Sequence, residues 1–284
     1  MAIIRNVLDF HPDHTFDCGQ CFRWIREEDG SYTGIASGRP VNIRVIPVKA
    51  AGSRPEDPVD ILIDNATQEE ADTLWRSYLD LDRDYGRIKE QLAAEDSVME
   101  RAIRHGYGIR ILNQDRWETI LSFLISQNNN IPRIRGCIES LCRHFGEPAG
   151  EYRGKQYYDI PTPERLATLT VEDLAPCRLG YRARYILETA RQVREQGIGD
   201  TSEYLRSLCG VGEKVANCIL LFSMNRLESF PVDVWVRRVM HELYGIPEKD
   251  TAAMTDYAAK HFGPYGGIAQ QYLFYYIREG QETC

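Results

Sequence analysis

The sequence predicts an α+β fold in which an antiparallel, β-rich N-terminal domain precedes an all-helical region of two lobes. Strand-like alternation and hairpin signals occur before residue 65, whereas apolar residues follow a helical spacing from about residue 67 onward. A glycine-containing turn between two helical patterns predicts two helices joined by a tight turn at about 202–224. The 284 residues are 43% hydrophobic, enough for a core in each part. We place the two domains at residues 1–105 and 106–284.

The β-rich domain is predicted from one hairpin and one alternating strand. Residues 21–26 and 31–35 flank Asp29-Gly30, a pair that favours a tight β-turn. Residues 41–46 alternate apolar and polar side chains, as expected of a strand with one buried face.

Helix-start signals follow along the rest of the chain. Thr67 and Glu70 form a capping box ahead of an apolar helical pattern that includes Leu74, Trp75 and Leu79. Further helix starts are predicted at Asp115, at Thr162-Pro163, at Thr170 and at Gly180.

The turn Gly210-Val211-Gly212 is the strongest candidate for a functional backbone segment. Glycine permits positive φ and close approach of another backbone, and successive N–H groups at a helix start can bind phosphate oxygens. Lys214 follows in the first helical turn, with Cys218 and Phe222 on the same face of the helix. A simple turn without any ligand is the alternative for such a glycine pair.

Asp233 is the second candidate, because it follows Pro231 and precedes a helical pattern as an N-cap residue would. A carboxylate at the positive end of a helix stays ionised and could face Lys214 across two packed helices. The alternative is a plain helix cap with no chemistry.

These residues resemble a known motif pair. Residues 208–214 together with Pro231-Val232-Asp233 are similar to the helix-hairpin-helix motif, Gly/Pro-rich loop and catalytic aspartate of base-excision DNA glycosylases. The lysine is typical of members that also cleave the DNA strand. Residues 19–24, 128–134, 180–185 and 263–270 further resemble 8-oxoguanine DNA glycosylases of the eukaryotic type. Departures at Cys21, Phe222 and Trp235 and a short segment before Gly263 indicate a bacterial branch.

The resemblance implies a role for each matching residue. Lys214 and Asp233 would be catalytic. The damaged base would contact Gly19, Cys218, Phe222, Gln270 and Phe274. The gap left by the extruded nucleotide and the opposite base would be held by Asn128, Arg133, Tyr181 and Arg182. The DNA backbone would contact Gly210, Val211, Gly212 and Trp235. Without the resemblance, Phe274 and Cys218 would be core residues, and Arg133 and Arg182 would lie on a solvated helix face.

The implied reaction is excision of 8-oxoguanine, preferably opposite cytosine, from an extruded nucleotide. Neutral Lys214 would attack C1′ and form a Schiff base, which permits β-elimination and strand cleavage. We expect burial and the helix N-terminus to lower the pKa of Lys214 below its usual value of about 10.4. Two alternatives remain: an alkylpurine glycosylase of the 3-methyladenine type without lyase activity, and a non-catalytic helix-hairpin-helix module that only binds DNA.

Cofactors and location are predicted from cysteines and charge. The eight cysteines are scattered and only Cys284 lies beyond Cys218, which disfavours an iron–sulfur cluster, and Cys18 and Cys21 lack partners for zinc. No cofactor is expected. By resemblance, the carbonyls of Arg206, Leu208 and Val211 would hold a monovalent or calcium-like ion.

The net charge of −8 argues against a nonspecific nucleic-acid binder, but the acidic residues gather in the first third of the chain. The remainder can therefore carry a basic face for damaged double-stranded DNA, because phosphate neutralisation is local. We expect a monomer that does not contact membranes and resides in the bacterial cytoplasm at the nucleoid.

Overall fold

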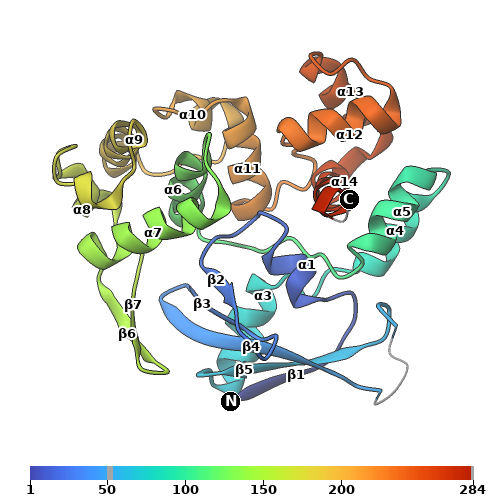
Figure 1. The fold of residues 1–284 in the computed structure, drawn as a ribbon, viewed down its shortest axis with the longest axis horizontal. Helices are drawn as coiled ribbons and strands as arrows, with labels where there is room; N and C mark the ends of the chain where they lie inside the picture. Colours follow the sequence, from blue (N-terminus) through green and yellow to red (C-terminus); the bar gives the residue numbers. More distant parts are fainter. Residues whose placement is uncertain (50–53, 283–284) are drawn as a thin grey trace.

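The computed structural model describes residues 1–49 and 54–282, and it contains a five-stranded antiparallel sheet with helices packed above it (Figure 1). The strand order is β1-β5-β4-β3-β2. The bounds are β1 (Ala2–Val7), β2 (Trp24–Arg26), β3 (Tyr32–Ala36), β4 (Arg39–Pro47) and β5 (Val59–Asp64). This arrangement confirms the predicted α+β class.

The predicted hairpin is present as β2 and β3, which pair antiparallel with Trp24 opposite Gly34. The alternation predicted for residues 41–46 is wrong at Asn42, which is buried. Its side-chain amide donates to the hydroxyl groups of Ser31 at 2.7 Å and Thr33 at 3.0 Å. A buried amide with these partners is tolerated in a sheet, and the pattern alone does not reveal the partners.

The helices begin mostly where the sequence predicts. Thr67 and Glu70 form the predicted capping box, and Asp115, Thr162 and Asp233 each cap a helix with a side-chain oxygen. The helices are α1 (Pro12–Phe16), α2 (Gln68–Glu70), α3 (Arg76–Tyr78), α4 (Tyr85–Ala93), α5 (Ser97–His105), α6 (Arg116–Ser126), α7 (Ile131–Phe145), α8 (Pro163–Ala167), α9 (Arg182–Gln196), α10 (Ser202–Ser207), α11 (Glu213–Ser223), α12 (Val234–Tyr244), α13 (Thr251–His261) and α14 (Gly266–Glu282).

Two helix predictions need correction. The stretch after Thr67 is interrupted by a π-helical turn over Ala71–Trp75 between α2 and α3. Thr170 opens turns and a short 3-10 segment, Ala175–Cys177, instead of an α-helix. Its hydroxyl and amide bind Asp173, which closes a local turn that competes with helix propagation.

The helical region forms two groups on either side of α11, as predicted. Figure 1 shows α6 to α10 on one side and α12 to α14, joined by α4 and α5, on the other. The first group also carries a β-hairpin, β6 (Pro148–Tyr152) and β7 (Lys155–Tyr158), so this region is not all-helical. β6 packs beside β4, which joins the first group to the sheet.

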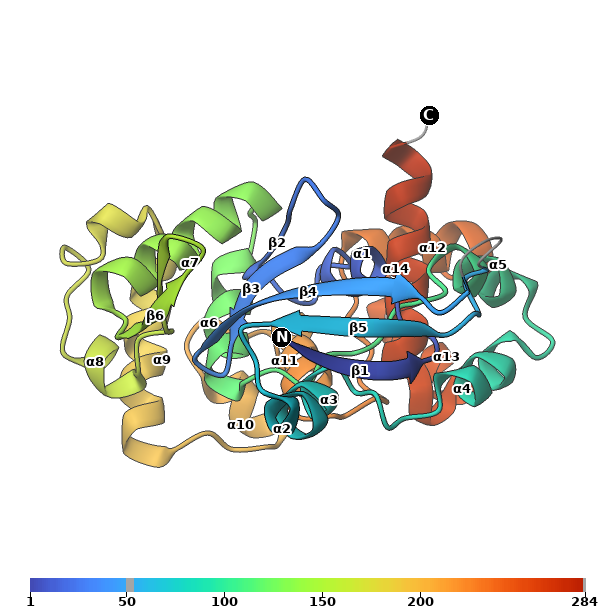
Figure 2. The same ribbon diagram turned by 90° about the horizontal axis from the view of Figure 1, so that it is seen from below.

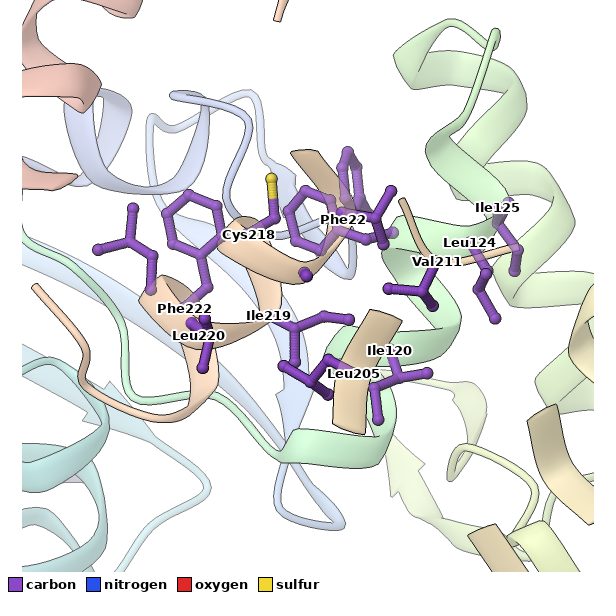
Figure 3. Packing of buried hydrophobic residues seen from close by; sticks show 14 of the residues in the cluster. Phe22, Ile120, Leu124, Ile125, Leu205, Val211, Cys218, Ile219, Leu220 and Phe222 are labelled. Atoms are coloured by element: carbon purple, nitrogen blue, oxygen red, sulfur yellow. The ribbon is translucent and has the colours of Figure 1, made fainter. Parts of the chain in front are cut away.

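Two hydrophobic cores hold these parts. The smaller core lies between the sheet and the α3 segment, where the Trp24 ring stacks on Phe16 with ring centroids 4.5 Å apart. The larger core runs through both helical groups and includes residues of α4 and α5. Figure 3 shows Leu205, Val211 and Ile219 of the helix-hairpin-helix unit packed beside α6. Figure 2 shows α14 crossing behind the sheet.

Candidate active site

A pocket lies where the two helical groups meet the loop that precedes β2. Every residue predicted for the base pocket and for catalysis lines it. These are Gly19, Lys214, Cys218, Phe222, Asp233, Gln270 and Phe274. Four further lining residues were not predicted from the sequence: Cys18, Phe123, Pro231 and Gln271. The pocket thus gathers residues from five separate stretches of the chain.

Lys214, Cys218 and Phe222 share one face of α11, as their i, i+4 and i+8 spacing requires. The Phe123 ring, from α6, stacks on Phe222 with ring centroids 5.5 Å apart and an interplanar angle of 15°. The Lys214 ammonium lies 5.3 Å from the centroid of the Phe123 ring, within cation–π range. Phe123 therefore helps to position the lysine, a contact that the sequence analysis did not predict.

The expectation of a lowered pKa for Lys214 is wrong. Burial disfavours its ammonium form, but the interactions with Cys218 and Asp233 together favour it more strongly and raise the pKa above its usual value. Burial raises the pKa of the Cys218 thiol, and the charge of Lys214 only partly offsets this. At neutral pH the free protein therefore holds a cationic Lys214 beside a neutral thiol.

Asp233 is the N-cap of α12, and its Oδ1 accepts a hydrogen bond from the Val236 N–H at 2.8 Å. Burial raises the pKa of Asp233, while this backbone hydrogen bond and the charge of Lys214 act in the opposite direction. Both side chains line one pocket, as expected of a lysine and an aspartate on adjacent helices. The arrangement places an amino group and a carboxyl group together in a half-buried site.

The loop at Gly19 forms the opposite wall of the pocket. Gly19 has φ of +80°, and a Cβ there would lie 3.2 Å from Cε1 of Phe274. Both the backbone conformation and the close approach of that ring therefore favour glycine at this position. The neighbouring Gln20 is buried and fixes the loop: its amide donates to the carbonyls of Thr15 and Arg110, both at 2.8 Å.

α14 contributes the remaining wall through Gln270, Gln271 and Phe274. Both glutamines are buried, and the Gln271 side-chain amide donates to Oε1 of Gln270 at 2.8 Å. The Arg278 guanidinium lies 5.3 Å from the centroid of the Phe274 ring. The Phe274 ring is thus in contact with both Arg278 and the Gly19 loop.

The hairpin turn is held by hydrogen bonds to its carbonyl groups. The Thr189 hydroxyl donates to the Cys209 carbonyl at 3.1 Å, and the Gln127 amide donates to the Gly210 carbonyl at 3.1 Å. Gly210 has φ of +80°, and a Cβ there would lie 2.4 Å from the Tyr185 ring. A Cβ on Gly212, the N-cap of α11, would meet nothing within 4 Å. The two glycines therefore have different roles: the first is needed to fold the turn, and the second leaves an open surface at the helix start.

This difference predicts separable effects of two alanine substitutions. Gly210→Ala should lower the free energy of unfolding by roughly 1–3 kcal/mol, because it combines strained φ with a ring clash. Gly212→Ala should leave the melting temperature near the wild-type value and weaken binding to duplex DNA, because the added methyl group lies where a phosphate would approach. Equal melting temperatures for the two variants would contradict this assignment.

The residues predicted to hold the opposite base lie together at the start of α7 and α9. Asn128 has φ of +46° and is exposed, and its amide donates to the Tyr181 hydroxyl at 3.4 Å. Arg182 is buried and donates to the carbonyls of Gln127 and Asn128, so in the free protein its guanidinium supports the loop. Arg133 is exposed, with one long contact of 3.5 Å to the Arg178 carbonyl.

Gln127 was missed as a site residue, yet it joins two parts of the site. Its side chain binds the hairpin turn at Gly210, and its own carbonyl accepts from Arg182. Nothing in the sequence pattern distinguishes this glutamine from a surface residue. Trp235, predicted to contact the DNA backbone, is partly exposed in the first turn of α12, next to the exposed residue Val234.

Two further observations bear on cofactors and membranes. In the described part of the chain, no three His, Cys, Asp or Glu side chains are grouped as metal ligands would be. Cys18 and Cys21 are both buried and their thiols donate to the carbonyls of Thr15 and Phe16. Among residues 1–49 and 54–282, none of the helices has the length and apolar character needed to cross a membrane.

The hairpin turn leads directly into α11, whose Lys214 lines one pocket with Asp233, the N-cap of α12. Residues 121–264 match the HhH-GPD superfamily of base excision DNA repair proteins, and the chain belongs to that superfamily. Residues 2–120 match the N-terminal domain of 8-oxoguanine DNA glycosylases. The chain is therefore a member of the 8-oxoguanine DNA glycosylase family, as its motifs indicated.

Individual relatives agree with this placement. An 8-oxoguanine glycosylase/lyase of Clostridium acetobutylicum, solved with double-stranded DNA containing cytosine opposite 8-oxoguanine, is 40% identical with a TM-score of 0.89, covering 98% of this chain and 95% of that one. The N-glycosylase/DNA lyase of Saccharomyces cerevisiae is 32% identical, covering 82% of this chain and 68% of the yeast protein. A 3-methyladenine DNA glycosylase of Archaeoglobus fulgidus shares the fold at 22% identity and a TM-score of 0.76.

Proposed function

We propose that this protein excises 8-oxoguanine from double-stranded DNA, preferably opposite cytosine, and then cleaves the strand through a Schiff base at Lys214. One observation carries the proposal: a single pocket brings Lys214 and Asp233 together with Gly19 and Phe274. An enzyme that acts on a base needs such a pocket outside the helical stack, because the target nucleotide must be extruded.

Recognition of the oxidised base would depend on the Gly19 backbone. Guanine has an acceptor at N7, whereas 8-oxoguanine carries a hydrogen there, so a carbonyl acceptor favours the damaged base. The Cβ-free Gly19 loop permits that close approach. Phe274 and Cys218 would stack on the two faces of the purine, and the Gln270 amide would bind its Watson–Crick edge.

Lys214 would supply the nucleophile and Asp233 the compensating charge. Attack of the neutral amine on C1′ forms the C–N bond as the base departs with the electron pair of the glycosidic bond. The sugar carries positive charge in the transition state, which the Asp233 carboxylate stabilises. Ring opening then gives a Schiff base, and loss of a C2′ proton expels the 3′ phosphate.

The hairpin would hold the DNA backbone, with or without an ion. The Leu208 carbonyl accepts from the Val211 N–H at 3.1 Å and retains a second lone pair for a cation. Together with the carbonyls of Arg206 and Val211, it would suit a monovalent or calcium-like ion, and no chemistry would pass through this ion. The proposed reaction would need neither a second copy of the chain nor an iron–sulfur cluster. It would take place in the bacterial cytoplasm, where the DNA lies.

The decisive experiment is incubation with a labelled duplex that contains 8-oxoguanine opposite cytosine. We expect release of free 8-oxoguanine and a cleaved strand without added alkali. A duplex with guanine at the same position is the negative control. Release of 3-methyladenine without strand cleavage would favour the alkylpurine glycosylase, and binding without any released base would favour the non-catalytic module.

The raised pKa of Lys214 predicts a pH dependence of base release. The neutral amine is the reactive form, and below the pKa its fraction rises about tenfold with each pH unit. Single-turnover rates should therefore increase from pH 6 to pH 9, where the raised pKa keeps the amine mostly protonated. A rate that falls over this range would show that attack by this amine does not limit base release.

Arg133 is expected to set the preference for cytosine, because its forked donors suit the acceptors of that base and its side chain is exposed. Arg133→Ala should reduce the ratio of the excision rates measured opposite cytosine and opposite adenine. The variant should remain as stable as the wild type. Arg182→Ala should also lower stability, because it removes the buried guanidinium that donates to the carbonyls of Gln127 and Asn128. Arg104→Ala, on the distant helix α5, is the control; an unchanged preference in Arg133→Ala would refute this role.

A further inference from the structure

Gln271 is a buried polar residue of the pocket that the chemistry above does not use. It is 3% exposed and lines the pocket beside Gln270, which is also 3% exposed. Adjacent residues of a helix do not normally face each other, yet these two side chains are joined by a hydrogen bond of 2.8 Å. This bond has a direction: the Gln271 amide nitrogen donates and Oε1 of Gln270 accepts.

The direction of the bond leaves a specific acceptor unused. Oε1 of Gln271 is buried and has no hydrogen-bond partner among the described residues. An unpaired carbonyl oxygen of this kind is costly in the free protein, so its retention in a ligand pocket needs a reason. A bound molecule that brings a donor to this position would satisfy it.

We propose that Gln271 is a specificity-determining residue that fixes the orientation of Gln270 and accepts a hydrogen bond from the exocyclic 2-amino group of the extruded purine. This inference rests on the proposed excision of 8-oxoguanine. Along its Watson–Crick edge that base presents the O6 acceptor, the N1–H donor and the N2–H donors in order. The Gln270 amide nitrogen, Oε1 of Gln270 and Oε1 of Gln271 offer the complementary donor, acceptor and acceptor.

The hydrogen bond between the two glutamines supports this order. In the structure the oxygen of Gln270 faces Gln271 and its nitrogen points away, and rotating the Gln270 amide alone by 180° would break the bond from Gln271. An oxygen has two lone pairs, so Oε1 of Gln270 can accept from Gln271 and from N1–H together. The pair then rejects a purine without the 2-amino group, because Oε1 of Gln271 would remain buried and unpaired.

The test compares two bases that differ only in this group. Duplexes carry either 8-oxoguanine or 8-oxohypoxanthine, which lacks the 2-amino group, opposite cytosine, and single-turnover base release is measured. The wild type should release 8-oxoguanine at least about tenfold faster, which corresponds to about 1.4 kcal/mol. 8-Oxohypoxanthine pairs less strongly with cytosine and is easier to extrude, so this bias acts against the expected result.

Two variants separate the roles of the side chain. Gln271→Met keeps the length of the side chain without either hydrogen-bonding group. The ratio of the release rates of 8-oxoguanine and 8-oxohypoxanthine should fall about tenfold in this variant. Gln271→Glu keeps an acceptor but not the amide donor, so it should retain the preference while releasing both bases more slowly. Gln196→Met, at the exposed end of α9, is the control for the exchange. The control should release both bases, and should cleave an abasic site, at the wild-type rates.

The outcomes distinguish this inference from the function on which it rests. If the wild type releases no 8-oxoguanine, the proposed function fails. If it releases both bases at equal rates, or if Gln271→Met keeps the full preference, only the role of Gln271 is overturned. Should Gln271→Met fail to fold, loss of the preference in Gln271→Glu would overturn that role equally.

Discussion

Lys214→Gln should abolish the covalent adduct that borohydride traps between the wild-type protein and DNA containing 8-oxoguanine. A Schiff base is reducible only if the amine has attacked C1′, and glutamine has no nucleophilic amine. We expect base release to fall on the order of 10³-fold or more, since the covalent route is lost altogether. Duplex binding should persist, because one charge is a small part of a contact set that neutralises several phosphates.

The adduct itself gives the sharpest control. Proteolysis of the trapped wild-type complex should place DNA on the peptide that contains Lys214. Lys249→Gln, which removes an exposed lysine before α13, should leave trapping unchanged. Crosslinking at another lysine, or full activity of Lys214→Gln, would overturn the mechanism.

Asp233→Asn should slow base release by about 10²–10³-fold, because an amide cannot neutralise the positive charge that develops on the sugar. Asparagine caps helices as well as aspartate does, and its side-chain oxygen can still accept from the Val236 N–H. The variant should therefore melt near the wild-type temperature. It should also still cleave a preformed abasic site to some extent, because that substrate needs no glycosidic bond broken.

A second helix cap provides the matched comparison. Asp250 caps α13 through a hydrogen bond of 2.9 Å from the Ala253 N–H and lies outside the pocket. Asp250→Asn should leave base release unchanged. If Asp233→Asn were less stable than the wild type, but its folded molecules released the base at the full wild-type rate, the aspartate would be only a helix cap.

Much of this site could be predicted from local sequence. The turn at Gly210, the cap at Asp233 and the stripe from Lys214 to Phe222 are short-range patterns with a direct physical meaning, and the structure places them as expected. The fold class followed for the same reason, because period-2 and period-3.6 patterns are local.

What could not be predicted depends on contacts between distant segments. Phe123 could not be predicted as a site residue, because its role depends on the Lys214 ammonium and the Phe222 ring, which lie far along the chain. The sequence predicts the wrong direction for the pKa of Lys214, because it indicates the neighbours Cys218 and Asp233 but not that their effect exceeds that of burial. Gln271 gains meaning only from an unpaired oxygen, which no sequence pattern encodes.

The wall formed by the Gly19 loop and α14 has a consequence for folding kinetics. The Arg278 side chain donates to the Asp17 carbonyl at 2.5 Å, across 261 positions of sequence. Contacts of such long sequence separation form late, because loop closure must be completed before they contribute stability. A partly folded chain with an intact hairpin would thus bind DNA before its base pocket had formed. Protection of the α14 amides from hydrogen exchange during refolding should accordingly report when the enzyme becomes selective for the damaged base.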